Sequence, residues 1–527
     1  MFENALRPDF HLGHVLMKKM QQHSDLLCQI DGGTGDAETF GSVLSRSIKL
    51  AKCLRNFGLK VGDVVAVGGW NHLDMSIPIY SAILNGMISV GVSPYYKYHE
   101  IKDLFAITKP KIAFCERNFF DTYKKVKEDL KLNTKIVAFG HGYKAWSEFI
   151  KKYDDDEAEE KFKIADIDPD NTCQFLICTS GSTGKAKAVA FTQTPIYSKI
   201  IHDISKYFDL MDIIRGTNSL QLSPVNVIGN YVTLISLPLL GQCKLQSSIP
   251  DDIDVIINMI NKYKPISTHL NPHILAEVIK RKDQVDLTCF GVIAGVGEKI
   301  NDKLFLEVKN CMREDSGLFE NVGQTETVGH IFNYTEGCPL GSCGKSLLPC
   351  FSHKLVDPES GNEVTEPNVL GEMWIRGPCL KEYYNDPEET QKVFSKDGYF
   401  KTGDLYYRDE NGFYYFGNRI KTIIKWKGCS VFPGQIEDVI RTHEGVKDVC
   451  VVGIAHPEDG ERPTACVIRE DRSCVTAQEI KDLVIEKLSV NKELRGGVAF
   501  FKEFPMTATG KIARKTLVDI VSNTTRE

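Results

Sequence analysis

The sequence lacks the features that would mark a membrane, secreted or nucleic-acid-binding protein. Acidic and basic residues nearly balance over 527 residues, at a net charge of −6, so no excess of positive charge indicates a nucleic acid or an anionic membrane as partner. No apolar run reaches the roughly 18 residues needed to cross a bilayer, and the first residues contain no signal-peptide core. The last residues form no peroxisomal tripeptide. These absences predict a cytoplasmic protein that acts on small molecules.

The cysteines are numerous, but their spacing in the sequence shows no close pairs. Sixteen are scattered along the chain, and none form a C-x-x-C pair. A disulfide framework is typical of short secreted chains, and a structural zinc site needs paired ligands at close spacing. Cys338, Cys343 and Cys350 are the densest group, but they lack that paired spacing. We therefore expect reduced, partly buried thiols.

Short apolar runs alternate with amphipathic stretches in the first part of the chain. Residues 63–67, 111–115 and 135–139 are typical of buried strands, and apolar residues between positions 43 and 54 recur at helical spacing. Strands that alternate with helices predict parallel sheets in an α/β fold. A chain of 527 residues exceeds the usual size of a single core, so at least two domains are expected.

The pattern changes near residue 350. From there, strands joined by Gly-rich and Pro-rich turns replace the alternation of strands and helices. The sequence Glu-Asn-Gly at residues 410–412 predicts a hairpin turn. A linker is expected near residues 418–421, and the remaining segment is long enough for a second, smaller domain.

Residues 178–192, CTSGSTGKAKAVAFT, concentrate hydroxyl residues, glycines and lysines after an apolar strand. Gly181 and Gly184 permit positive φ angles, so consecutive backbone N–H groups can converge on one anion, and Lys187 adds positive charge. The loop is not a Walker A motif, because two residues rather than four separate its glycines and alanine follows Lys185. Taken alone, the stretch is either a phosphate cradle or a flexible surface turn.

Six short motifs follow one another along the chain. They are residues 179–184 with Lys187, then GQTE at 323–326, GSCGK at 341–345, TGD at 402–404, NRIK at 418–421 and PMTATGK at 505–511. In this order they resemble the signatures of the adenylate-forming superfamily, which includes acyl-CoA synthetases, 4-coumarate-CoA ligases and beetle-type luciferases. The resemblance runs from about residue 40 to 515. Each motif is weak alone, but six in order are specific.

The resemblance implies a division of the chain into two domains. The expected N-terminal domain, residues 1–417, contains parallel-rich sheets with helices and a β-barrel-like subdomain. A hinge at residues 418–421 joins it to a small, mobile α+β domain of residues 422–527. The small domain is expected to rotate about Lys421 between two reaction steps.

The resemblance also implies the reaction. ATP and Mg²⁺ activate a small-molecule carboxylic acid to an acyl-adenylate, releasing pyrophosphate, and coenzyme A then takes the acyl group. Two anions must approach each other in the first step, so positive charge and oriented donors have to offset their repulsion. The expected phosphate-binding residues are Thr179, Ser180, Gly181, Ser182, Thr183, Gly184 and Lys187.

Other motifs supply the remaining expected roles in catalysis. Glu326 would bind Mg²⁺, which prefers carboxylate and phosphate oxygens, and Thr325 would hydrogen-bond the α-phosphate. Gly323 belongs to the same nucleotide-binding motif. Lys511 would stabilise the charge of the transition state.

A further set of expected roles falls after residue 400. By resemblance, Asp404 and Arg419 would hold the ribose, and Lys421 would be the hinge residue. Lys425 and Gly428 would form the face presented to coenzyme A in the second step, where a glycine leaves room for the pantetheine arm.

The expected substrate pocket departs from the family pattern. Asn226 and Val227 replace an aromatic or histidine pair, and Val322 replaces an aromatic residue that packs on adenine. Gly297 lies in a pocket strand that matches only in part. We expect an acid different from beetle luciferin, whose identity stays open, as does the oligomeric state. Two alternatives also stay open: a luciferase that oxidises its adenylate with O₂, and a catalytically silent binding protein.

Overall fold

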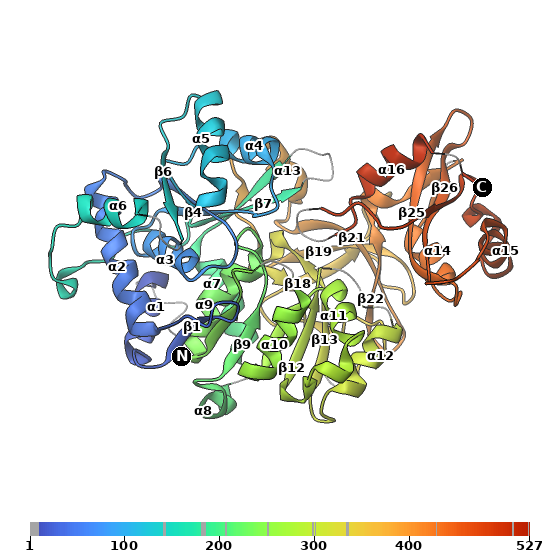
Figure 1. The fold of residues 1–527 in the computed structure, drawn as a ribbon. Helices are drawn as coiled ribbons and strands as arrows, with labels where there is room; N and C mark the ends of the chain where they lie inside the picture. Colours follow the sequence, from blue (N-terminus) through green and yellow to red (C-terminus); the bar gives the residue numbers. More distant parts are fainter. Residues whose placement is uncertain are drawn as a thin grey trace. The chain divides into compact units, whose positions relative to one another are not determined.

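The computed structural model describes most of the chain. The described residues are 10–140, 144–180, 186–205, 208–249, 252–297, 300, 302–333, 337–427, 429–507, 511–524 and 526–527. They form two compact units (Figure 1). Unit 1 comprises Met1–Leu340, Ser346–Ser352 and Arg376–Gly398, and unit 2 comprises Gly341–Lys345, His353–Ile375 and Tyr399–Glu527. The expected hinge at residues 418–421 falls inside unit 2, and the domain limits stay a prediction.

One seven-stranded sheet of unit 1 contains the strands on either side of residues 181–185. In spatial order its strands are β20 (Glu382–Tyr383), β8 (Ala186–Phe191), β7 (Phe175–Ser180), β4 (Ile88–Val92), β3 (Val64–Gly68), β5 (Ile112–Glu116) and β6 (Lys135–Phe139). The strands from β7 to β6 are parallel, whereas β8 and β20 are antiparallel to their neighbours. The expected strands at residues 63–67, 111–115 and 135–139 are thereby confirmed.

Helices accompany this sheet as the alternating pattern predicts. The helix expected from the spacing of residues 43–54 is α2 (Phe40–Asn56). It begins where the Thr39 side chain accepts the Ser42 N–H, and it ends before Gly58, whose φ of 101° favours glycine. The other helices of unit 1 before residue 206 are α1 (Leu12–Gln22), α3 (Ser76–Leu84), α4 (Tyr98–Thr108), α5 (Phe120–Asp129), α6 (Ala145–Tyr153) and α7 (Gln193–Ser205).

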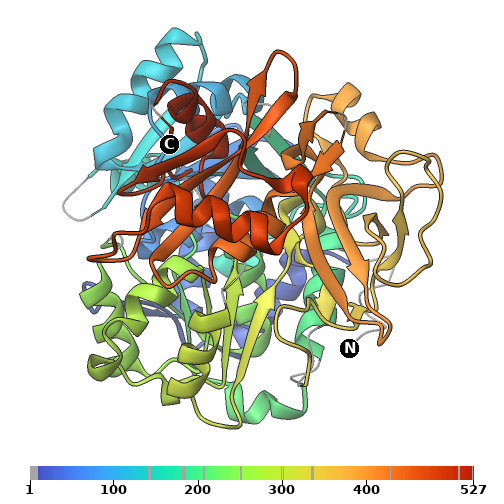
Figure 2. The same ribbon diagram turned by 90° about the vertical axis from the view of Figure 1, so that its right-hand side faces the viewer.

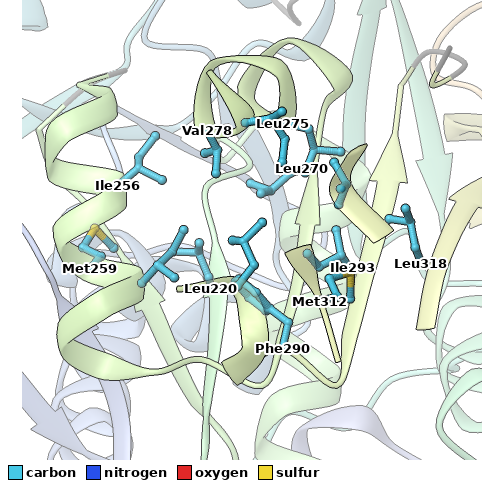
Figure 3. Close-up of a cluster of buried hydrophobic side chains, with 14 of the residues drawn as sticks. Leu220, Ile256, Met259, Leu270, Leu275, Val278, Phe290, Ile293, Met312 and Leu318 are labelled. Carbon is cyan, nitrogen blue, oxygen red and sulfur yellow. The ribbon is translucent and has the colours of Figure 1, made fainter. Parts of the chain in front are cut away.

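A second seven-stranded sheet completes the large core of unit 1. Its order is β13 (Gly317–Asn321), β12 (Val292–Val296), β11 (Ser267–Leu270), β9 (Asn218–Gln221), β10 (Cys243–Gln246), β1 (Leu27–Asp31) and β2 (Ala37–Thr39). Leucine and isoleucine side chains of β9, β11, β12 and β13 pack against α10, α11 and α12 (Figure 3). The helices of this part are α8 (Met211–Ile214), α9 (Ile228–Leu240), α10 (Ile253–Tyr263), α11 (Pro272–Ile279) and α12 (Asp302–Cys311).

Two short hairpins and one helix close unit 1. The hairpins are β14 (Gly323–Gln324) with β15 (Gly329–His330), and β16 (Phe332–Asn333) with β17 (Ser346–Leu347). The helix is α13 (Pro387–Val393), which follows β20 and begins where the Asp386 side chain accepts the Glu389 N–H. The β14–β15 hairpin carries the GQTE motif.

Unit 2 contains two sheets. One has the order β18 (Ser352–Val356), β19 (Gly371–Arg376), β21 (Phe400–Arg408) and β22 (Tyr414–Arg419), and residues 410–412 form the expected turn between β21 and β22. The other has the order β24 (Cys429–Val431), β23 (Ile424–Trp426), β26 (Gly460–Arg469) and β25 (Val446–His456), with β27 (Gly497–Phe501) parallel to β26. Figure 2 shows the long strands of this second sheet in orange to red.

Alternation along β25 gives the second sheet two packed faces. Val449 and Val451 contact α14 (Pro433–Ile440) and α15 (Ala477–Lys487), whereas Cys450 and Val452 contact α16 (Arg514–Ser522). Because successive strand residues point to opposite faces, helices can cover both sides of these strands. The α/β fold with a smaller α+β C-terminal part is therefore present.

All sixteen cysteines are free thiols, and most of them are buried. Among the described residues, no helix is both long and apolar enough to traverse a lipid bilayer. The expected cytoplasmic location stays a prediction.

Candidate active site

The β7–β8 hairpin positions the two ends of the predicted phosphate loop. Thr179 lies directly opposite Lys187 across this hairpin, and the last pair before the loop is Ser180 with Ala186. The predictions for Gly181, Ser182, Thr183 and Gly184 concern residues outside the described part of the chain. The strand pairing explains why a threonine and a lysine eight positions apart in sequence lie side by side.

Lys187 is held by two side chains from the segment of residues 380–389. Its ammonium group forms an ion pair with Glu389 and lies 4.7 Å from the centre of the Tyr383 ring. The hydrogen bond from Lys187, followed by one from Lys392, lowers the pKa of Glu389 from 4.5 to about 2. Glu389 and Tyr383 thereby hold the Lys187 side chain at the start of β8.

We expect Glu389→Gln to weaken the fold in a pH-dependent way. The pKa of Glu389 is lower in the folded protein than in the unfolded chain, so its stabilising contribution is fully present above about pH 4.5 and disappears as the pH falls towards 2. The difference in melting temperature between wild type and variant should be constant near neutral pH and shrink below pH 4.5. Glu388→Gln, one position earlier, is the control and should show no such trend.

Glu326 is oriented by the same segment. It lies in the turn Thr325–Thr327, and its carbonyl oxygen accepts the Leu380 N–H at 2.7 Å. The Tyr383 hydroxyl donates to Glu326 Oε1 at 3.0 Å. Burial, and then the nearby Glu326 carboxylate, raise the pKa of Tyr383 far above its ordinary value, so the phenol keeps its proton and remains a donor.

We expect Tyr383→Phe to raise the Mg²⁺ concentration needed for activity about tenfold. A hydrogen bond to a charged group contributes about 1.5–3 kcal/mol, and its loss would let the carboxylate rotate away from the predicted magnesium position. Pyrophosphate release measured against Mg²⁺ concentration tests this expectation. Tyr384→Phe is the matched control, because its backbone N–H bonds to Ala188 but no hydrogen bond of its hydroxyl is found among the described residues. An unchanged Mg²⁺ requirement in the Tyr383 variant would contradict the assignment.

The backbone of the β14–β15 hairpin is tightly constrained at two positions. A Cβ atom on Gly323 would lie 2.0 Å from the Gly329 carbonyl oxygen, which no side chain tolerates. Val328 adopts a left-handed conformation with φ of 57°, which is a rare outlier for a β-branched residue. The Thr327 hydroxyl donates to the Gly329 carbonyl at 2.7 Å. This strained turn fixes the position of Thr325 and Glu326.

A buried charged cluster contacts the same hairpin. Lys199 and Asp203 of α7 form an ion pair, and His330 Nε2 of β15 lies 3.2 Å from Asp203 Oδ1. Burial opposes ionisation of Asp203, but its interactions with His330 and Lys199 outweigh this effect and keep the pKa of the Asp203 carboxyl well below its usual range. The cluster therefore joins α7, which follows β8, to β15, the strand that follows the GQTE motif.

The residues predicted for the substrate pocket lie on three separate loops of unit 1. Asn226 is 2% exposed, and neither amide atom makes a hydrogen bond of normal geometry with the described residues, although the Tyr96 hydroxyl lies close enough to interact. Val227 caps the start of α9, Gly297 follows β12 with φ of 93°, and Val322 accepts the Ile331 N–H. The structure does not bring these four residues together in one described cavity.

Asp404 and Arg419, predicted to hold the ribose, face each other in unit 2. They are paired across β21 and β22, and Arg419 Nε lies 3.0 Å from Asp404 Oδ1. Asp404 is buried, whereas Arg419 is exposed. Lys421 lies two residues later in the 3-10 turn Ile420–Thr422, where Asn418 Oδ1 accepts the Thr422 hydroxyl at 2.8 Å.

Lys425 and Lys511 both lie on the surface of unit 2. The Lys425 N–H donates to Glu461 Oε2 at 2.8 Å, and Gly428 lies outside the described residues. Two hydrogen bonds join Thr507 and Lys511: the Thr507 N–H donates to the Lys511 carbonyl at 2.6 Å, and the Lys511 N–H donates to the Thr507 side-chain Oγ1 at 3.1 Å. Arg514 anchors the end of this turn by donating to the Val451 carbonyl and to Glu437 Oε1, each at 2.8 Å.

Sequence patterns missed the side chains that hold the predicted residues in place. Tyr383 and Glu389 lie outside every motif, and the Lys199–Asp203–His330 cluster joins two distant segments. The available signal was the i, i+4 spacing of Lys199 and Asp203 on α7. No comparable signal existed for Tyr383, since 57 residues separate it from Glu326.

Two family models match the chain. One is described as AMP-binding enzyme and matches residues 16–384, and the other is described as AMP-binding enzyme C-terminal domain and matches residues 435–511. The chain is 29% identical over 524 residues to a luciferin 4-monooxygenase of Photuris pensylvanica, covering 96% of this chain and 94% of that protein. It is 27% identical over 552 residues to probable 4-coumarate–CoA ligase 2 of Dictyostelium discoideum, covering 98% and 97%.

Solved structures share the fold. The ATP-bound MatB of Rhodopseudomonas palustris superposes with a TM-score of 0.86 at 21% identity, covering 97% of this chain and 99% of that one. The anthranilate CoA ligase AuaEII, in complex with anthranoyl-AMP, gives a TM-score of 0.83 at 20% identity, covering 98% of each chain. Together with the motif order and the match over most of the sequence, these findings show that the chain belongs to the AMP-binding enzyme family.

Proposed function

We propose that this protein uses ATP and Mg²⁺ to convert a carboxylic acid to its acyl-adenylate, and then transfers the acyl group to coenzyme A. The proposal rests on one observation: Tyr383 contacts both Lys187 and Glu326. Its ring lies 4.7 Å from the Lys187 ammonium, and its hydroxyl donates to the Glu326 carboxylate at 3.0 Å. A cation for phosphate and a carboxylate for a metal ion are therefore held by one side chain.

Binding of the ATP phosphates requires a positively charged side chain that is held in a fixed position. Lys187 is largely buried and its ammonium is fixed by Glu389, so it can attract the β- and γ-phosphates without reorganising. Thr179, directly across the hairpin, supplies a hydroxyl donor. Backbone N–H groups of residues 181–184 are proposed to complete the cradle.

The residues present fit a magnesium ion. Glu326 offers carboxylate oxygens, which Mg²⁺ prefers, and Tyr383 engages only Oε1, while Oε2 accepts no hydrogen bond from any described residue. When bound, Mg²⁺ would draw charge from the phosphate oxygens during pyrophosphate departure. Tyr383 holds the carboxylate in one rotamer, as second-sphere donors commonly do.

Unit 2 is proposed to supply the remaining groups. The buried Asp404 carboxylate can accept hydrogen bonds from both ribose hydroxyls, and Arg419 is the neighbouring cation. Lys511 is proposed to place its charge between the attacking carboxylate and the α-phosphate in the transition state. Lys421 is the proposed hinge, and Lys425 with Gly428 is the proposed second-step face.

The acid itself is proposed to be recognised near Asn226. A buried amide without hydrogen bonds of normal geometry is costly, so a polar group on the substrate would satisfy it. Val227, the next residue along the chain, adds an apolar side chain beside Asn226. We therefore propose an acid whose acyl part combines an apolar body with one hydrogen-bonding group.

One assay separates the candidate functions. The protein is incubated with ATP, Mg²⁺ and a panel of carboxylic acids, and pyrophosphate release is measured with coenzyme A or with O₂ alone. Thioester formation supports the proposal. Light emission with a luciferin supports the alternative favoured by the luciferin 4-monooxygenase relative. No pyrophosphate exchange with any acid would overturn both and favour a catalytically silent binding protein.

A further inference from the structure

A small cavity lies beside the second sheet of unit 1, away from every residue assigned to the reaction. It has a volume of about 10 Å³, which is room for a single water-sized species. Its wall combines apolar side chains of α2 and α9 with a few polar ones, among them Lys244, Cys28, Gln29, Tyr80 and Thr233.

Lys244 is the unusual member of this wall. It lies on β10, opposite Gln29 of β1, and is 6% exposed. Among the described residues it has neither an ion-pair nor a hydrogen-bond partner, in contrast to the equally buried Lys52, which contacts Asp155 Oδ1 at 2.7 Å. Burial lowers the pKa of Lys244 to about 8, so the amine is mostly protonated at neutral pH. No carboxylate contributes to this shift, and the only other contribution comes from the Cys28 thiol.

The other polar groups of the wall are already engaged. The Tyr80 hydroxyl donates to the Leu234 carbonyl at 2.8 Å, and the Thr233 hydroxyl donates to the Gly229 carbonyl at 2.8 Å. Gln29 Nε2 donates to Glu38 Oε2 at 2.6 Å and to the Leu73 carbonyl at 2.9 Å. The ammonium of Lys244 is therefore the main donor left for an occupant of the cavity.

A β-bulge brings a second donor to the same wall. The register of β1 against β2 shifts between Leu27 and Gln29, so Cys28 is the extra residue of the strand. A bulge re-aims its side chain, which explains how Cys28 and its neighbour Gln29 both line the cavity. The Cys28 thiol is a weak donor that forms no disulfide.

We propose that this cavity is a binding site for one monatomic anion, chloride under cellular conditions, held by the Lys244 ammonium and the Cys28 thiol. A buried positive charge without a counter-charge is strongly unfavourable, and an anion removes that penalty. The volume excludes phosphate, sulfate and carboxylates, which need more than a water-sized space. This inference is independent of the proposed enzymatic function.

The first test is thermal unfolding in sodium chloride against sodium gluconate at equal ionic strength. Gluconate is too large for the cavity, so the wild-type melting temperature should be about 1–2 °C higher in chloride at roughly tenfold excess over Kd. Lys244→Met removes the charge but keeps the length and apolar stem. This variant should be insensitive to chloride and, in gluconate, at least as stable as wild type, because an unpaired buried charge has been replaced by an apolar group.

Lys52→Met is the matched control. It removes an equally buried lysine that already has carboxylate partners, so the variant should be less stable but keep the full chloride response. An equal chloride response in wild type and Lys244→Met would overturn the proposal. Crystals of the wild-type protein soaked in bromide give an independent result: one anomalous peak beside Lys244 is expected, and a water molecule alone at that position would also overturn it.

Discussion

Lys511→Ala is expected to slow acyl-adenylate formation by about a hundred-fold or more while leaving the fold intact. Removing one group that stabilises transition-state charge typically has an effect of this size. The substitution touches no core residue, because Lys511 is exposed and its turn is held by the backbone contacts with Thr507 and by Arg514. ATP–pyrophosphate exchange measures the loss directly, and the melting temperature should not change.

The control for this prediction lies four residues further on. Lys515 is exposed at the start of α16, so Lys515→Ala removes the same charge from the same segment without the proposed role. Exchange activity should stay near the wild-type level. A Lys511 variant that retained full exchange activity would show that the charge is supplied by another residue.

Gly323→Ala is expected to abolish most of the activity and to destabilise unit 1 by about 3 kcal/mol. The added Cβ would lie 2.0 Å from the Gly329 carbonyl oxygen and 2.6 Å from the His330 Cα, so the hairpin has to open. Thr325 and Glu326 follow directly on this strand and would move with it. A displacement of about 1 Å at such a position can cost a hundred-fold in rate.

Gly329→Ala, on the opposite strand, is the control. It distinguishes the steric clash at Gly323 from the cost of a positive φ angle alone. Gly329 has φ of 91°, but a Cβ there would meet no atom within 4 Å. The variant should therefore lose only about 1 kcal/mol of stability, the usual cost of a positive φ for alanine. Urea unfolding and pyrophosphate release, measured on both variants, should show a much larger loss for Gly323→Ala. Equal losses would mean that the close backbone approach is unimportant.

The sequence predicted the architecture because local patterns and the fold agree. Short apolar runs at residues 63–67 and 111–115 became central parallel strands, since only such a run can be buried on both faces of a sheet. The motif order predicted the family because the spacing between motifs is set by the strands and helices that separate them. The apolar strand before the predicted phosphate loop, β7, was likewise a local signal.

The site could be predicted only where its residues lie within motifs. Tyr383 lies on β20, which pairs with β8 nearly 200 positions away in the sequence, and its contact with Glu326 spans 57 residues, so no periodicity reveals either contact. The left-handed Val328 was equally unpredictable, because valine is among the residues least expected there. The sequence shows that Asn226 departs from the family pattern, but only the three-dimensional structure shows that its amide is buried without normal hydrogen bonds.

The segment of residues 380–389 is a position at which proteolytic cleavage would inactivate the enzyme. Leu380 and Tyr383 hold Glu326, and Glu389 holds Lys187, so ten consecutive residues fix both the carboxylate proposed to bind the metal ion and the lysine proposed to bind phosphate. A single protease nick within this stretch would release both at once. Resistance to limited digestion at this position is thus a direct readout of whether the two halves of the nucleotide pocket are assembled, and nucleotide should protect it.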